Sequence, residues 1–266
     1  MSPKKLPAWF IGHGAPTFLL SDNAARRFWK SLPAVLASQT SQKPRAILSI
    51  SAHWQTSNLC FSGQVAEPII QHDFSGFPAE LYDIRWPLPS GLEVGQDLLA
   101  QFQTLGLQVE SDPSYPLDHG SWVPLREAWP KPEIPVFQLS ICPQKGTRWH
   151  YELGQKLAFL REQGVLIIAN GGISHNLRKI HWRMAEDEAV DWAQQFMQAF
   201  ETALKNQDID ALLDPMSLPF GAQAVPTLDH YLPFLVFAGL TEDLATETLY
   251  QGWMYGSLAC HAYSTI

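Results

Sequence analysis

The chain has 266 residues, 46% of them hydrophobic, and its ten Trp and fourteen Phe supply enough apolar side chain for a packed core, which excludes a disordered protein. A formal net charge of −8 excludes the basic surface that nucleic-acid binding requires. No apolar run approaches the roughly 20 residues of a spanning helix, and three scattered cysteines without a CxxC motif fit reduced thiols, so we expect a cytoplasmic protein without a membrane partner.

Short apolar segments alternate with segments of helical spacing, and no linker or repeat interrupts them. Strands are expected at 7–12, 45–51, 134–140 and 165–170, and helices at about 22–38, 92–105, 151–163, 185–206 and 226–238. The segment 247–263 is typical of two antiparallel strands around Gly256. This order predicts an α/β fold, a single domain over residues 1–266 with a mostly parallel central sheet flanked by helices and antiparallel edge strands at the C-terminus.

Several residues indicate where regular structure begins and ends. Ser21 or Asp22 can cap the first helix, in which Pro33 would introduce a kink. Thr227 can cap the last helix, and Gly239 can end it. The segments 60–89 and 114–125 have no regular period, and long irregular segments in a compact domain are usually functional.

Histidines follow three of the expected strands. His13 and His53 come directly after apolar segments, and His175 lies a few residues past another, where two glycines allow a sharp turn. In open α/β sheets, ligands bind beyond the carboxyl ends of the strands. A single histidine in such a place is usually a hydrogen-bonded core residue, but three in equivalent places favour a shared site at one edge of the sheet.

Together with His230, these histidines favour a metal site. Neutral imidazole is a common ligand of zinc and iron, and a few histidines that leave positions open on the metal are typical of a catalytic site. The candidate ligands are His13, His53, His175 and His230, all from separate loops. Simpler interpretations exist, since His13 could hydrogen-bond a loop carbonyl and His230, beside Asp229, could belong to a helix cap.

Two further histidines lie in the irregular segments. His119 follows Asp118 and has no strand to align it with the others, so we assign it proton transfer beside the metal, because an imidazole titrates near roughly pH 6.5. His72 could either hold the aromatic-rich loop or contact a substrate. The remaining histidines are assigned to the surface or to packing, namely His150, His181 and His261.

Six ordered motifs between His13 and Phe234 resemble those of the class III extradiol ring-cleaving dioxygenases, and within that family the DOPA 4,5-dioxygenase-like branch. They are HGAP at His13, SAHW at His53, HDFSGFPAELY from His72, LDHGSWVPL at His119, GGISHNL at His175 and PTLDHYLPF at His230. The resemblance implies a mononuclear non-haem centre, with Fe(II) active in ring opening and Zn(II) often retained in its place.

The resemblance also implies roles for the histidines. His13, His53 and His230 match the family's metal ligands. His175 matches a residue that binds the metal or serves as acid/base, and His119 matches a histidine that faces the substrate. More distant class III enzymes have a glutamate as third ligand, whereas this chain has His230 there, and an all-histidine site suits zinc as readily as iron.

The implied reaction is the opening of a catechol by O2, next to its hydroxyls rather than between them, to a semialdehyde. Candidate substrate-binding residues are His72, Phe74, Phe77, Tyr82 and Trp122, although the aromatic ones suit the core equally. A zinc-dependent hydrolase and a non-catalytic binding protein on the same fold are the alternatives. The expected partners are a small-molecule catechol and O2, and the sequence leaves monomer and homodimer both open.

Overall fold

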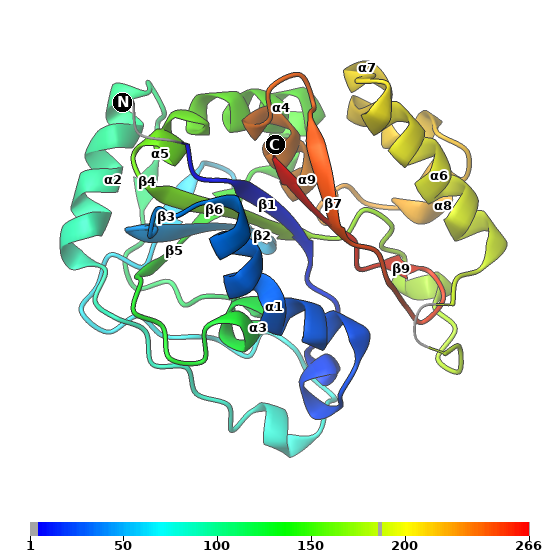
Figure 1. The fold of residues 1–266 in the computed structure, drawn as a ribbon, viewed down its shortest axis with the longest axis horizontal. Coiled ribbons are helices and arrows are strands. Elements are labelled where there is room, and N and C mark those ends of the chain that lie inside the picture. Colours follow the sequence, from blue (N-terminus) through cyan, green and yellow to red (C-terminus); the bar gives the residue numbers. More distant parts are fainter. Residues whose placement is uncertain (1–4, 186–187, 266) are drawn as a thin grey trace.

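The computed structural model describes residues 5–185 and 188–265 (Figure 1). Within this part of the chain, eight strands form one sheet in the order β4-β3-β5-β2-β6-β1-β10-β7. Their bounds are β1 (Ala8–Gly12), β2 (Ala46–Gln55), β3 (Cys60–Ser62), β4 (Glu110–Ser111), β5 (Val136–Ile141), β6 (Val165–Gly171), β7 (Thr246–Tyr250) and β10 (Ala262–Thr265). The central strands β5, β2, β6 and β1 are parallel, β10 pairs antiparallel with β1, and β7 pairs antiparallel with β10. The predicted α/β sheet with antiparallel C-terminal strands is confirmed.

The helices cover both faces of this sheet. They are α1 (Ala24–Gln39), α2 (Leu92–Thr104), α3 (His119–Ala128), α4 (Gly146–Leu157), α5 (Phe159–Glu162), α6 (Asp191–Lys205), α7 (Ile209–Leu213), α8 (Gly221–Ala224) and α9 (Leu232–Leu240). Single 3-10 turns are η1 (Pro16–Leu20), η2 (Ala79–Leu81), η3 (Pro143–Lys145), η4 (Leu177–Lys179) and η5 (Pro215–Ser217).

Side chains alternate between two cores because successive residues of a strand point to opposite faces of the sheet. In β1, Phe10 packs in one core with residues of α2, α4, α6 and α9. Trp9 and Ile11 pack in the other core with residues of α1 and α3, which lie side by side (Figure 1). Because β2 and β6 are buried along almost their whole length, their sequences are largely apolar.

Helix α1 begins later than predicted. Its cap is Asn23, whose side chain accepts a hydrogen bond from the backbone N–H of Arg26, so neither Ser21 nor Asp22 has that role. The helix continues through Pro33. At the other end of the domain, the predicted segment 247–263 contains four strands rather than two, because β8 (Trp253–Met254) and β9 (Leu258–Ala259) form a separate hairpin around Gly256.

Helix α6 was predicted from residue 185 but begins at Asp191. Ala189 forms a bridge with Gly256, and the N–H of Val190 donates to the carbonyl of Gly256, so these residues pair with the C-terminal hairpin instead of joining the helix. Residues 186–187 of the predicted helix lie outside the described residues. The helix predicted at 151–163 begins earlier, at Gly146, and is divided into α4 and α5.

Helix α9 begins at Leu232, so Thr227 does not cap it, and Gly239 lies inside it. The glycine serves close packing rather than termination. A Cβ on Gly239 would lie 2.0 Å from the carbonyl oxygen of Tyr151 in α4, so only glycine lets the two helices approach this closely.

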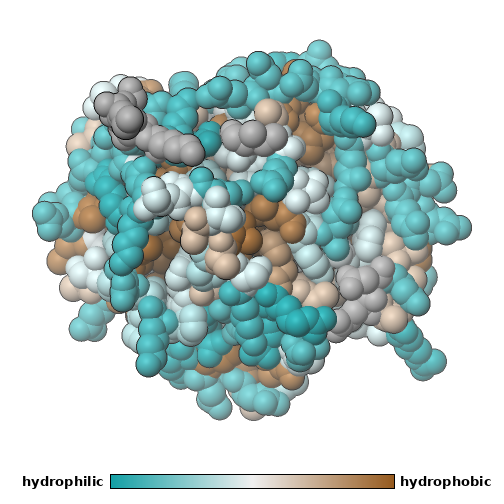
Figure 2. Space-filling view, viewed as in Figure 1, coloured by the Kyte–Doolittle hydropathy of each residue, from teal (hydrophilic) through white to brown (hydrophobic). Residues whose placement is uncertain are grey.

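Every helix in the described part of the chain is too short or too polar to cross a bilayer. On the face seen in Figure 2, hydrophilic side chains cover most of the surface and the hydrophobic areas are small and separate. Cys60, Cys142 and Cys260, which all lie within the described residues, form no disulfide bond with one another.

Candidate active site

The carboxyl ends of three neighbouring parallel strands carry the histidines of the candidate site. Strand β6 lies between β2 and β1, and Gly12 of β1 is level with Gly171 of β6. His13 follows β1 directly, and His175 lies four residues past the end of β6. His53 lies within β2, which runs on to Gln55, four residues beyond the predicted end of that strand.

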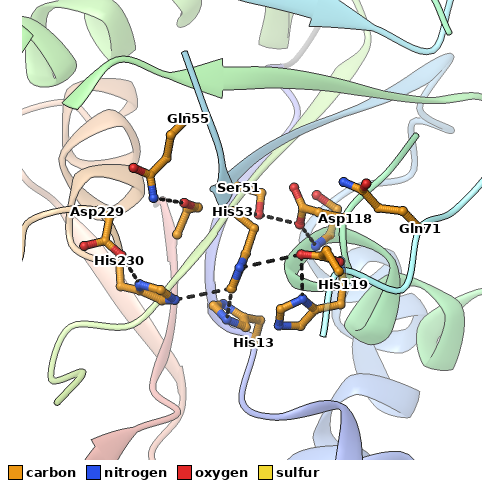
Figure 3. Close-up of polar contacts among 12 residues, drawn as sticks. His13, Ser51, His53, Gln55, Gln71, Asp118, His119, Asp229 and His230 are labelled. Carbon is orange, nitrogen blue, oxygen red and sulfur yellow. Dashed lines mark hydrogen bonds and ion pairs between the residues drawn. The ribbon is translucent and has the colours of Figure 1, made fainter. Parts of the chain in front are cut away.

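The rings of His13, His53 and His230 meet through their Nε2 atoms (Figure 3). The Nε2 of His53 is 3.0 Å from that of His13 and 3.3 Å from that of His230. The three residues form a group whose possible ligand atoms all lie within 4.8 Å of one another. They come from β1, β2 and the segment before α9, so the site exists only in the folded chain.

Burial favours the neutral form of two imidazoles of this group, those of His13 and His53. Desolvation, and then the charge of His230, lowers the pKa of His13 well below its ordinary value. Desolvation, followed by the charge of His119, does the same for the pKa of His53. A neutral imidazole offers a lone pair to a metal, whereas a protonated one cannot bind it.

His230 is oriented by Asp229. Its Nδ1 lies 2.5 Å from Oδ2 of Asp229 and donates its proton there, so the lone pair is on Nε2, the atom that faces His53. Burial alone would raise the pKa of Asp229, but the hydrogen bond from His230 lowers it well below its ordinary value, so it stays ionised. Three convergent imidazole nitrogens fit a divalent cation such as Zn(II) or Fe(II).

Two glycines allow the close approaches in this site. A Cβ on Gly171 would lie 2.3 Å from the carbonyl oxygen of His230, so glycine at the end of β6 is required to seat that ligand. A Cβ on Gly120 would lie 2.9 Å from Cδ2 of His53, so glycine is also required where α3 passes β2.

His175 lies beside the group rather than in it. Its ring stacks on that of His230 with centroids 3.5 Å apart and planes at 6°. Burial, followed by the charge of His230, lowers its pKa well below its ordinary value. Within the described residues, the three-histidine group does not include His175, although the sequence also suggested it as a ligand.

His119 begins α3, in a segment that was predicted to be irregular. Asp118 caps this helix by accepting a hydrogen bond from the N–H of Ser121, and Pro124 within it hid the helical pattern. The buried Asp118 also accepts hydrogen bonds from Ser51 and Gln138. Desolvation raises the pKa of Asp118 to about 6.

Asp73 is a residue of the site that was not predicted from the sequence. Its carboxylate accepts hydrogen bonds from the backbone N–H of His119 at 2.8 Å and from Nδ1 of the same residue at 2.9 Å. Its Oδ2 lies 3.7 Å from Nδ1 of His53, and these three residues form a second group of possible ligands. In the sequence, only its position next to His72 in an irregular segment indicated that Asp73 could have a functional role.

Phe74 is the predicted aromatic residue that lies nearest the histidines, with its ring centroid 5.7 Å from that of His119. Phe77 and Tyr82 pack against Phe74. Trp122 is fully buried and donates its indole N–H to the carbonyl of Gln71, so it supports the loop from the core. His72 contacts the rings of Phe74, Tyr82 and Trp122.

A cavity of about 760 Å³ borders this aromatic cluster. It is lined mainly by apolar side chains, with a few polar groups, which is typical of small-molecule sites. Its lining includes Ile70, His72, Tyr82, Arg85, Trp86 and Leu88. Two of the predicted substrate-binding residues, His72 and Tyr82, therefore face a space large enough for a small organic molecule.

Comparison with known proteins gives consistent matches. The family model described as the catalytic LigB subunit of aromatic ring-opening dioxygenase matches residues 7–261. A 4,5-DOPA dioxygenase extradiol of Escherichia coli (strain K12) is 34% identical over 263 residues, covering 97% of this chain and 94% of that protein. The protein of the same name from Beta vulgaris is 34% identical over 262 residues, covering 96% of this chain and 94% of its own. The crystal structure of an uncharacterized protein from Escherichia coli K12 matches with a TM-score of 0.81 at 30% identity, covering 98% of this chain and all of that one.

Proposed function

This chain belongs to the LigB family and is an extradiol ring-cleaving dioxygenase, and from this premise we propose that it is a metal-dependent enzyme that opens a DOPA-like or related catechol with O2 to a semialdehyde. The observation that carries the proposal is the convergence of three imidazole nitrogens beside His119. The names of the relatives support a catecholic substrate. We also propose that residues 1–266 act as one catalytic domain, since the family match spans nearly the whole chain.

In this proposal the metal ligands are His13, His53 and His230. When bound there, Fe(II) would supply the redox chemistry that lets a singlet catechol react with triplet O2, which is slow without a metal. The all-histidine ligand set suits Zn(II) as well, so the metal has to be determined by reloading.

The other residues of the chain bind the catechol and move its protons. His119 accepts a proton from a catechol hydroxyl, because its ring lies 4.0 Å from that of His53, centroid to centroid. His175, neutral and stacked on His230, is the second group for proton transfer. Phe74 covers the site from the side of His119, and the cavity lined by His72 and Tyr82 accommodates the substituent of the ring.

Family membership favours this reaction over the zinc hydrolase and the binding protein that the sequence left open. The test is oxygen uptake by metal-stripped protein reloaded anaerobically with Fe(II) or Zn(II) and then given DOPA, caffeate, protocatechuate or gallate. We expect uptake that matches the yield of a yellow ring-opened product in the Fe(II) sample alone.

Two variants control this experiment. His53→Ala should abolish uptake, whereas His181→Ala, which removes an exposed histidine, should not change it. If neither metal form consumed O2 with any of these catechols while the metal still bound, ring cleavage of this class of compound would be refuted.

A further inference from the structure

We infer that Asp73 is a positioning residue that fixes the tautomer of His119 and so makes its Nε2 the proton acceptor for the substrate. The inference rests on the proposed function, because it assigns a role within the same site. Asp73 comes from the irregular segment that also carries His72 and Phe74, so it links the aromatic cluster to the histidine that moves the proton.

The two oxygens of Asp73 have different partners on the same residue. Oδ1 accepts from the backbone N–H of His119 at 2.8 Å, and Oδ2 accepts from its ring Nδ1 at 2.9 Å. A carboxylate oxygen that carries no proton can only accept, so whenever the His119 ring holds a single proton, that proton lies on Nδ1. The lone pair is therefore on Nε2, the only ring atom left to accept a proton.

The surroundings of His119 place this lone pair in the site. The side chain of His119 is only 9% exposed, and its ring lies 4.0 Å from that of His53 and 5.6 Å from that of His13. Figure 3 shows the ring of His119 next to those two ligands. A catechol whose oxygens approach His13 and His53 therefore also approaches His119.

Asp73 could instead be a metal ligand, since it forms a group with His53 and His119. The hydrogen-bond geometry favours positioning. One oxygen accepts from the main-chain N–H of His119, and the other is 2.9 Å from Nδ1 of His119 but 3.7 Å from Nδ1 of His53, so both oxygens are directed to His119. The two interpretations differ in metal content, which can be measured.

Asp73→Asn gives a sharp test because it replaces two acceptors with one acceptor and one donor. The main-chain N–H of His119 can only donate, so it continues to donate to the oxygen of the new side-chain amide. The amide NH2 then faces Nδ1, which must become the acceptor, and the ring proton moves to Nε2. Asp73→Asn therefore selects the wrong tautomer, whereas Asp73→Ala imposes none, so we expect Asp73→Asn to be the less active variant.

The first measurement needs no turnover. Zn(II)-loaded protein is diamagnetic, so a long-range ¹H–¹⁵N correlation spectrum can assign the ring tautomer of His119. We expect the Nδ1–H form in the wild type and the Nε2–H form in Asp73→Asn. The same samples are given 4-nitrocatechol, whose visible absorption band shifts as its hydroxyls lose protons, and we expect less ionisation of the bound molecule in the variant.

The second measurement uses Fe(II)-loaded protein. We expect the kcat of Asp73→Asn to fall about 10²-fold with little change in KM, since general base catalysis contributes at least that factor. Adding Asp73→Asn to His119→Ala should lower kcat no further. Asp83→Asn, the same change at an exposed position in the same segment, should leave kcat unchanged.

Three results would overturn the inference. They are loss of bound metal in Asp73→Asn, an unchanged His119 tautomer, and a further loss of activity in the double variant. If the wild type opened no catechol, the proposed function would fail, but the tautomer and nitrocatechol measurements on the Zn(II) protein would still decide the role of Asp73.

Discussion

His175 lies flat against His230, with ring centroids 3.5 Å apart and planes at 6° to each other. The stack joins a proposed metal ligand to a proposed acid/base residue. His175 approaches through its ring face, so its contact with His230 is one of packing. The backbone N–H of His175 donates to the carbonyl of Ala224, which holds the residue in this place.

This stack predicts the effect of His175→Phe. Phenylalanine keeps a flat ring against His230 but has no nitrogen, so bound metal should be retained while kcat falls about 10²-fold, as expected for loss of a general acid or base. Metal content by atomic absorption and kcat by oxygen uptake check both parts. Loss of the metal from His175→Phe would instead make His175 a ligand.

Metal binding should stabilise the fold because the ligands come from three separate parts of the chain. Free metal at 1,000 times its Kd adds about 4 kcal/mol to the free energy of unfolding. Chelation should therefore lower the Tm of the wild type and of His181→Ala but not that of His53→Ala. Equal effects of the chelator on all three proteins would contradict the assigned ligands.

Gly171→Ala should weaken metal binding although it replaces none of the proposed ligands. Its new Cβ would lie 2.3 Å from the carbonyl oxygen of His230, so the ligand must move. Overpacking of this kind costs about 1–3 kcal/mol, which corresponds to roughly 5- to 150-fold weaker binding.

The neighbouring glycine provides the control for that change. A Cβ on Gly172 would meet only the ring and Cβ of His175, at 3.4 Å or more, which is ordinary contact. Gly172→Ala should therefore bind metal nearly as tightly as the wild type, as measured by competition with a chelating dye. Equal losses in the two variants would show that Gly171 has no special relation to His230.

The metal-free protein should lose stability as the pH falls below about 6.5. His150 is buried, donates from Nδ1 to the carbonyl of Gly146 and accepts from the N–H of Cys142. Burial is the largest effect and lowers its pKa to about 4. The folded state therefore binds fewer protons than the unfolded state between pH 6.5 and 4, so the contribution of His150 is complete above this range and is lost as the pH falls through it.

Lowering the pH from 7 to 5 should reduce the free energy of unfolding by about 2 kcal/mol through His150 alone. Urea titrations at the two pH values measure the loss. His150→Gln, which does not titrate, should show a loss smaller by about that amount. An identical pH dependence in the two proteins would show that His150 titrates alike in the folded and unfolded states.

Much of the fold could be predicted from the sequence because buried parallel strands read as apolar runs. The strands β1, β2, β5 and β6 were expected within a few residues of where they lie. Helix ends were less predictable, because they depend on distant partners. Gly239 was interpreted as a helix stop, but its partner is the carbonyl of Tyr151 in another helix.

The candidate site could be predicted in part for the same reason. Histidines at the ends of strands indicated the edge of the sheet where His13 and His53 meet, and the motif around His230 added the third ring. Asp73 could not be found this way, since its role depends on the fold of an irregular segment over α3. Likewise, Pro124 concealed the helix that His119 begins.

Labelled oxygen tests ring opening by this protein directly: the Fe(II)-loaded protein reacts with its best catechol under ¹⁸O2, and mass spectrometry identifies the product. Ring opening by a dioxygenase places both atoms of O2 in the product, one of them in an aldehyde that exchanges with water. We predict a ring-opened semialdehyde with ¹⁸O retained in its carboxylate. A product whose new oxygen came only from water, or a product with an unopened ring, would contradict ring cleavage by a dioxygenase.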